Sequence, residues 1–230
     1  MNQIVTRGIV LRRTSYQEAD RILTVLTPDH GKVHALAKGV RKSKSKLAGG
    51  VELFSVSEIG FIHGRGELAT LTTARLTINY SNIVQDINRT MLGYELIKLL
   101  NKVTEDAAGE EYFNLLTDAF DALDQAKINI DLINLWFRTQ LLRIAGHTPN
   151  LRTDAAGNKL AQEGSYLFSY DDMAFLQKPQ SPYSAGHIKF LRLVFSGNAP
   201  RTLQQVTGVE SLILPCLNIV QTILPAHIRT

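Results

Sequence analysis

The side chains that most often perform catalysis are scattered along this chain and form no known motif. The sequence contains no HExxH, GxSxG, GxGxxG or DxD pattern to organise a metal, a nucleophile or a cofactor. Its six histidines show no ligand spacing. The single cysteine, Cys216, lies in an apolar stretch typical of an inert core thiol, and Asp171 and Asp172 are expected to form a turn. The sequence therefore predicts no catalytic residue, no metal site and no cofactor.

The clearest local feature is a basic loop, KGVRKSKSK, at residues 38–46. If this loop is extended, its side chains, about 3.3 Å apart along the chain, can follow a nucleic-acid backbone. Its serines and glycine would add hydroxyl and amide donors to phosphate oxygens. A solvated loop without a ligand is the alternative. Five of the nine residues are cationic: Lys38, Arg41, Lys42, Lys44 and Lys46.

Further cations lie on the expected strands of the first eighty residues or in their turns. Arg12 and Arg13 follow the first apolar run. Arg65 lies in a Gly-Arg-Gly-Glu turn, where it would contact a phosphate or pair with Glu67 or Glu52. Residues 1–80 hold twelve Lys or Arg against six Asp or Glu, whereas residues 81–150 hold six against ten. This distribution assigns any polyanion binding to the first segment.

The elements that must position these residues begin with five strand-length runs, at 4–12, 20–27, 32–37, 53–63 and 68–79. A Pro-Asp-His-Gly turn joins the second and third runs into a hairpin. Five strands without a convincing helix indicate a small closed barrel, and five is the number in an OB-fold. An SH3-like barrel has a similar pattern, so the pattern alone leaves both open.

Helical periodicity begins at residue 82. Stretches 82–104, 110–125 and 130–145 are amphipathic and predict a helical bundle, with Ser81 as the first N-cap and Gly146 ending the third helix. Residues 148–182 lose this periodicity around a β-like run at 165–169, and helical pattern resumes at 187–195 and after 210. The apolar positions of the first helix share one helical spacing: Ile83, Ile87, Met91, Tyr94 and Leu99.

Length and composition fit one or two globular domains, with 230 residues of which 44% are hydrophobic. No apolar run approaches the ~20 residues that cross a bilayer, and the N-terminus lacks the pattern of an export signal. The predicted fold class is α+β. A five-stranded OB-fold barrel occupies residues 1–80, and a helical domain occupies residues 81–230, with a small irregular or β insert at about 148–182.

Several short stretches together resemble the RecO family of bacterial recombination mediators and strand-annealing proteins. The matches are dense over residues 4–76 and 137–151 and thin after about 170. Leu26 stands where the family has Phe. The matching stretches are 8–13 (GIVLRR), 18–23 (EADRIL), 30–32 (HGK), 37–41 (AKGVR), 45–47 (SKL), 53–54 (LF), 64–68 (GRGEL), 94–96 (YEL), 137–143 (FRTQLLR) and 146–151 (GHTPNL).

The resemblance implies an N-terminal OB-fold, a helical bundle and an insert that many relatives build around zinc. The first CxxC pair of that insert would fall at Thr153 and Ala156, and no cysteine lies nearby. The insert is therefore expected to be a degenerate zinc-finger-like element without zinc. Packing of Leu167, Phe168 and Phe175 would then hold it together.

The resemblance also implies a function without catalytic residues. RecO proteins anneal complementary strands, including strands coated with the single-stranded-DNA-binding protein SSB, and with RecR help to load RecA. For this chain it implies a cytoplasmic, nucleoid-associated protein with no membrane partner that binds single- and double-stranded DNA. The matched basic positions are the expected DNA contacts: Arg12, Arg13, Lys38, Arg41, Lys42, Lys44, Lys46 and Arg65.

In relatives the helical domain docks the acidic, Phe-ended tail of SSB in an apolar groove with a basic rim. The basic residue that often precedes Phe137 is replaced here by Leu135 and Trp136. The resemblance therefore implies Trp136, Arg138 and Arg143 as the candidate residues for the SSB tail.

Two other functions fit the same residues. An adaptor could bind proteins through its barrel and acidic helices, with DNA contact incidental. An OB-fold RNA-binding or ribosome-associated factor would suit the same basic loop. Annealing of complementary strands distinguishes the first alternative from the DNA-binding hypothesis, and preference for structured RNA distinguishes the second.

Overall fold

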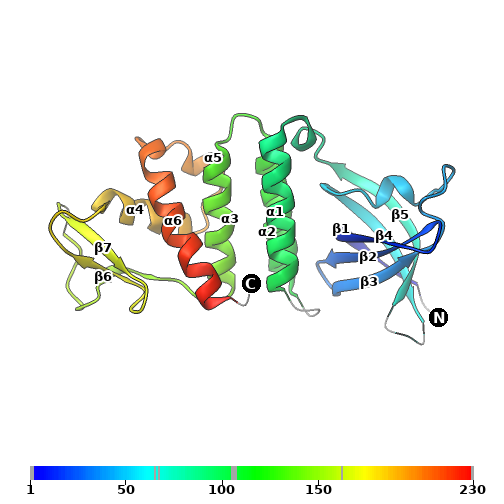
Figure 1. Cartoon of the computed structure of the whole chain (residues 1–230), viewed down its shortest axis with the longest axis horizontal. Coiled ribbons are helices and arrows are strands. Elements are labelled where there is room, and N and C mark those ends of the chain that lie inside the picture. The colour runs from blue at the N-terminus through cyan, green and yellow to red at the C-terminus, as the bar shows by residue number, and fades with distance from the viewer. Residues whose placement is uncertain (1–2, 65, 67, 105–107, 162, 229–230) are drawn as a thin grey trace. The chain divides into compact units, whose positions relative to one another are not determined.

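The structure is a computed structural model that describes residues 3–64, 66, 68–104, 108–161 and 163–228. The chain forms two compact units, residues 1–125 and 126–230. The first contains a β-barrel and two helices, and the second contains four helices and a small sheet (Figure 1).

The N-terminal unit is built on a closed barrel with the strand order β1-β2-β3-β5-β4, in which β4 also pairs with β1. The β3–β5 pairing is parallel and the others are antiparallel. This is a five-stranded Greek-key barrel of the OB type, as predicted. Its strands are β1 (Ile4–Tyr16), β2 (Asp20–Thr27), β3 (Gly31–Ala37), β4 (Ser55–His63) and β5 (Ala69–Asn79).

The barrel strands enclose one apolar core, and alternating burial is clearest in β3. In β3 the side chains of Val33, Ala35 and Ala37 point into the core, while the residues between them face outward. Phe61 of β4 is fully buried in the same cluster. β1 extends four residues beyond the predicted run, because it continues as a two-stranded hairpin with β2 up to the Tyr16–Asp20 pair.

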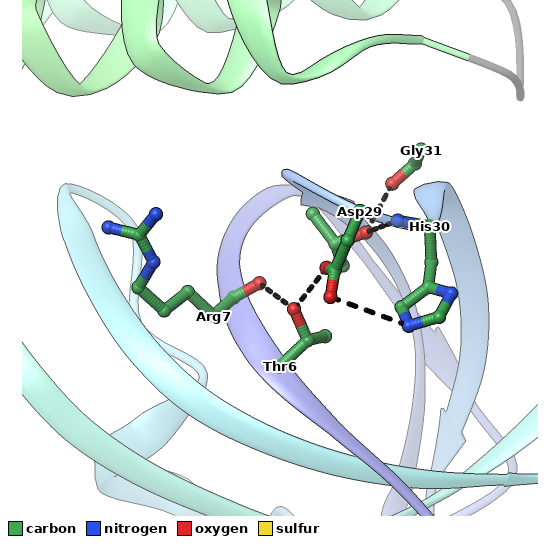
Figure 2. A network of polar contacts seen from close by, with 6 residues as sticks. Thr6, Arg7, Asp29, His30 and Gly31 are labelled. Carbon is green, nitrogen blue, oxygen red and sulfur yellow. Dashed lines mark hydrogen bonds and ion pairs between the residues drawn. The ribbon is translucent and has the colours of Figure 1, made fainter.

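The predicted Pro-Asp-His-Gly turn joins β2 to β3 and is fixed by a polar network (Figure 2). The Thr27 hydroxyl donates to the carbonyl of Gly31 at 2.9 Å and accepts from the N–H of His30 at 3.0 Å. Asp29 accepts a hydrogen bond from the hydroxyl of Thr6, and its carboxylate lies 3.6 Å from the His30 ring. The network therefore attaches this turn to the start of β1.

Two helices complete the N-terminal unit: α1 (Ile87–Val103), after a short 3-10 turn η2 (Ile83–Gln85), and α2 (Glu110–Asp124). Asp86, and not the predicted Ser81, caps α1, since its carboxylate accepts from the N–H groups of Asn88 and Arg89. The predicted apolar positions of α2 are buried as expected: Phe113, Leu116, Phe120 and Leu123.

The predicted apolar face of the first helix is wrong at three of its five positions, whereas Ile83, in η2, is fully buried and Leu99 is half-buried. Ile87, Met91 and Tyr94 are 70%, 64% and 49% exposed. The helix instead buries the neighbouring face, which contains Leu92, Gly93, Leu96, Ile97 and Leu100. Apolar residues occur on both faces, and packing against the barrel and α2 decides which face is covered.

The C-terminal unit packs helix α3 against the last helices of the chain. Gly146 ends α3 in a left-handed conformation with φ +81°, as predicted. The short helix α5 was not predicted. The helices are α3 (Ile130–Ile144), α4 (Ala185–Phe195), α5 (Pro200–Leu203) and α6 (Val209–His227).

Helix α6 is the one helix among the described residues that is long and apolar enough to cross a membrane by length and composition. That is weak evidence, because the core helix of a soluble protein passes the same test. Here α6 packs against α3 and α4 and buries Ile213, Cys216, Ile219 and Val220. Its apolar residues therefore form the core of this unit.

The predicted insert is a four-stranded sheet with the order β6-β8-β7-β9. Edge-to-face rings hold it together: Phe175 contacts Phe168, Tyr166 and Tyr183 with centroids 5.0–6.4 Å apart. Leu167 is 40% exposed, so its expected role in the packing is wrong, and the buried Tyr166 takes that place. The strands are β6 (Asn150–Asp154), β7 (Ser165–Ser169), β8 (Ala174–Gln177) and β9 (Tyr183–Ser184).

Candidate nucleic-acid interface

The basic loop (residues 38–46) follows β3 and is bonded to the turn between β1 and β2. The N–H of Gly39 donates to the carboxylate of Asp20 at 2.7 Å, and the N–H of Arg41 donates to the carbonyl of Ala19 at 2.9 Å. Gly39 has φ +62°, a conformation that a glycine adopts without strain. The loop is therefore attached to the barrel from its first residues.

The loop consists of consecutive turns and not of the extended backbone considered from the sequence. The N–H of Lys42 donates to the carbonyl of Gly39 at 3.1 Å, and the N–H of Ser45 donates to that of Lys42 at 3.0 Å. The side chain of Val40 is 4% exposed and belongs to the barrel core, against which Leu47 also packs. Burial of these two apolar side chains holds the backbone in place and turns the charged residues outward.

The structure brings together all five predicted cations of the loop on the surface. Each is exposed, and within the part of the chain that the structure describes none forms an ion pair or a side-chain hydrogen bond. Their charges are therefore available to phosphates without first breaking an internal contact. They are Lys38, Arg41, Lys42, Lys44 and Lys46.

The chain beyond the loop runs along the second half of β1. It starts at the β1–β2 turn, where Arg41 bonds to Ala19, and reaches Arg13, whose guanidinium lies 2.6 Å from the carboxylate of Glu52. Glu52 is thus a partner of Arg13, and the alternative pairing of Glu52 with Arg65 lies outside the described residues. Arg13 would have to exchange this carboxylate for a phosphate to contact DNA.

Arg12 lies on β1 beside a bulge. Val10 pairs with Val25 and Arg12 pairs with Thr24, so Leu11 is an extra residue in the ladder. Arg12 is exposed and forms no ion pair among the described residues. Arg65 lies outside the described residues.

One cation in the barrel has a structural role that the sequence did not reveal. The ammonium of Lys32 donates to the carbonyl of Asn101 at 3.2 Å and to that of Thr104 at 2.5 Å. These carbonyls belong to the C-terminal end of α1, where a cation also meets the negative end of the helix dipole. Lys32 therefore attaches α1 to the barrel. A basic residue in a strand facing a later helix is the only sequence signal of this contact.

Helix α2 presents the opposite charge. Asp118 and Asp121 are exposed, and partial burial raises the pKa of both carboxyls, with the neighbouring carboxylates raising it further. Burial and these aspartates also raise the pKa of Tyr80. Since phosphates are repelled by this surface, the electrostatics of the N-terminal unit direct a polyanion to the barrel loop.

The candidate residues for the SSB tail all lie on α3 but differ in exposure. Trp136 is 4% exposed and Arg138 is 9% exposed, so neither presents a surface to a peptide. Arg143 is exposed, and its Nε donates to Gln140 at 2.8 Å. Elsewhere in this unit a cavity of about 220 Å³ combines apolar Ile188 with cationic Lys189, a pair that the sequence reasoning did not select.

No catalytic cluster is found among the described residues. Cys216 is fully buried, and burial raises the pKa of its thiol to about 12. Asp172 lies in the turn between β7 and β8, where the Ser169 hydroxyl donates to its carboxylate at 2.7 Å. In the described ranges no three His, Cys, Asp or Glu side chains are grouped as metal ligands.

The fold and the loop together define a class: α+β proteins in which an OB-type barrel presents a cationic loop and is followed by a helical region. The family model "Recombination protein O N terminal" matches residues 1–80, and "Recombination protein O C terminal" matches residues 84–229. The chain belongs to the RecO family, and this membership supports a role in DNA repair and recombination. The predicted domain boundary at residue 80 stays a prediction. The two compact units divide after residue 125, since α1 and α2 group with the barrel.

Individual relatives agree with the family models. The DNA repair protein RecO of Dehalococcoides mccartyi is 31% identical over 202 residues, which are 85% of this chain and 79% of the relative. Those of Desulfatibacillum aliphaticivorans and Alkaliphilus metalliredigens are 36% and 34% identical, over 66% and 72% of this chain. The matched part is 60% of the first of these two relatives and 67% of the second.

Proposed function

We propose that the protein binds single- and double-stranded DNA without sequence specificity and anneals complementary strands. The observation that carries this proposal is the basic loop, whose backbone is bonded to the barrel while its five cations are exposed and unpaired within the described chain. Lysines and arginines bind phosphate oxygens, and such contacts carry no sequence information. Binding is therefore independent of sequence and weakens steeply with salt.

Annealing follows from the same charges. Two complementary strands repel each other, and a cationic surface that binds both lowers this repulsion and raises their local concentration. The step breaks no covalent bond and needs no catalytic residue. The protein accordingly acts as a mediator and not as an enzyme.

A fluorescence annealing assay tests the proposal. Two complementary labelled oligonucleotides are mixed with and without the protein across a salt series, in the presence of a chelator. We expect acceleration that fades as salt rises and that the chelator does not change. Folded protein that leaves the annealing rate unchanged would refute the proposal and favour the adaptor, and tighter binding to structured RNA than to single-stranded DNA would favour the RNA-binding alternative.

We further propose that the protein acts in the cytoplasm on SSB-coated DNA, with RecR as a partner and RecA loading as the outcome, as the family membership supports. Arg143 is the exposed member of the three residues first assigned to the SSB tail, and Lys189 lines a cavity together with the apolar side chains of Leu160 and Ile188, a combination that suits a Phe-ended acidic peptide. Fluorescence anisotropy with such a peptide, comparing Arg143→Ala with Lys189→Ala, identifies the site. No binding by the wild-type protein would remove the SSB tail as a partner.

A further inference from the structure

A groove lies between strand β1 and helix α1 of the N-terminal unit, with a volume of about 500 Å³. Its size is within the range of ligand pockets, about 300–1,000 Å³. Leu11, Leu53 and Ile97 form its apolar lining. Leu11 is the extra residue of the β1 bulge, which places Leu11 and Arg12 together at the groove.

Three cations border this apolar lining: Arg12 from the barrel and Lys98 and Lys102 from α1. All three are exposed, and none forms an ion pair within the described residues. Lys98 and Lys102 are four residues apart, so they lie on one side of the helix. The groove therefore combines an apolar interior with an uncompensated positive border.

The aromatic ring of Tyr94 stands at the groove and is 49% exposed. Its orientation is fixed by an edge-to-face contact with Phe54, with ring centroids 5.1 Å apart. Helical spacing continues from Tyr94 to the exposed Met91 and Ile87 in one direction and to Lys98 in the other. Along this face of α1, exposed apolar and aromatic side chains are therefore followed directly by the cation Lys98.

We propose that this groove holds an unpaired base of single-stranded DNA, with Tyr94 as its stacking surface and the bordering cations on the flanking phosphates. A fixed aromatic ring beside a cationic groove is the arrangement that binds single strands without sequence preference. Asn101 also lines the groove, and an asparagine side chain carries both a donor and an acceptor that could pair with a base edge. The inference rests on the proposed function and extends it from phosphates to bases.

The groove continues the interface of the basic loop. The chain that leaves the loop passes Glu52, the partner of Arg13, and the next residue, Leu53, lines the groove. A strand bound by the loop can therefore extend along β1 into the groove without leaving the N-terminal unit. A duplex cannot use the groove in the same way, because its bases are already paired and stacked.

Binding of a labelled oligothymidylate and of a duplex of equal length, measured by anisotropy, tests the proposal. Tyr94→Ala should weaken binding of the single strand roughly 5- to 150-fold, the effect of losing one stacked base, and should leave duplex binding unchanged. Tyr94→Phe should bind as the wild type does. Tyr170→Ala is the matched control, since Tyr170 is 41% exposed and also contacts a phenylalanine ring at 5.1 Å.

The outcomes separate this inference from the proposed function. If Lys42→Ala, Lys44→Ala and Lys46→Ala together weaken binding while Tyr94→Ala does not, the groove inference is overturned and the proposed function stands. Equal loss with both probes would overturn the role of an unpaired base. If Tyr94→Ala instead abolishes binding only of an acidic, Phe-ended peptide, the groove is a protein-docking site. A wild-type protein that binds neither probe would overturn both proposals.

Discussion

The basic loop permits a quantitative prediction. Lys42, Lys44 and Lys46 are exposed and, within the described chain, have no acidic partner, so each can neutralise one phosphate. For single strands the slope of log affinity against log salt is about −0.7 for each phosphate neutralised. Changing all three to alanine should therefore reduce the magnitude of the slope by about 2.

This change in slope has a visible consequence in a titration. Between about 50 and 200 mM salt, a difference of 2 in slope corresponds to about a 20-fold change in affinity. The triple variant should bind much more weakly than the wild type at low salt, and the two should converge as salt rises. Folding should be preserved, because substitutions of exposed residues usually change stability by at most about 0.5 kcal/mol.

The matched control removes the same charge elsewhere. Lys127, Lys159 and Lys178 are exposed and lie in the C-terminal unit. Their joint replacement by alanine should leave the slope close to that of the wild type. If the loop variant gives a line parallel to the wild type with unchanged affinity, or if both triple variants lose slope equally, the assignment of DNA binding to the loop is refuted.

Three further predictions concern the fold. Gly93→Ala should lower the free energy of unfolding by about 1–2 kcal/mol in denaturant titrations, because the new Cβ would lie 2.5 Å from the buried Phe54 ring, and this overpacking exceeds the gain in helix propensity. Burial lowers the pKa of His187, whose Nδ1 accepts a hydrogen bond from the N–H of Ser184. The neutral ring therefore contributes stability above the unfolded pKa of about 6.5, and this contribution is lost as the pH falls below it. His187→Gln should flatten this dependence of the melting temperature on pH. Phe175→Ala should destabilise the insert by about 3–5 kcal/mol, measured by hydrogen exchange of its strands, and full protection in the variant would contradict packing as its support.

Much of the barrel was predictable because its strands are strand-length runs rich in apolar and β-branched residues that end at turn signals. The bounds 20–27 of β2 agree with the structure, and the insert strand at 165–169 does too. The bulge in β1 was not predictable, because an extra residue in a ladder leaves no mark on a run of apolar side chains. The bulge nevertheless determines that Leu11 and Arg12 both reach the groove.

Helix α1 shows why periodicity alone chose the wrong face. Ile87, Met91 and Tyr94 have the same helical spacing as the buried Leu92 and its neighbours, so two overlapping apolar faces are present. Which one is buried depends on a contact distant in sequence: the ring of Phe54 packs directly onto Gly93. A glycine has no hydrophobicity, and the sequence pattern therefore gives no weight to the position that decides the packing.

The charges of the barrel were counted correctly but could not be assigned to roles from the sequence. Lys32 is directed at the end of α1, and Arg13 is paired with Glu52. Of the eight basic positions expected to contact DNA, Arg65 lies outside the described residues and Arg13 has an internal partner. Six remain: Arg12, Lys38, Arg41, Lys42, Lys44 and Lys46.

These six cations predict a slope of about −4 for single-stranded DNA if the loop and Arg12 are the whole interface. Adding Lys98 and Lys102 of the groove raises the expected magnitude to about 5.5. A wild-type slope near the larger value that falls by about 1.4 in Lys98→Ala/Lys102→Ala would show that the strand extends along α1. If the slope is near the smaller value and the double variant leaves it unchanged, the bound DNA strand is confined to the barrel. Cations that contact no phosphate release no counterions.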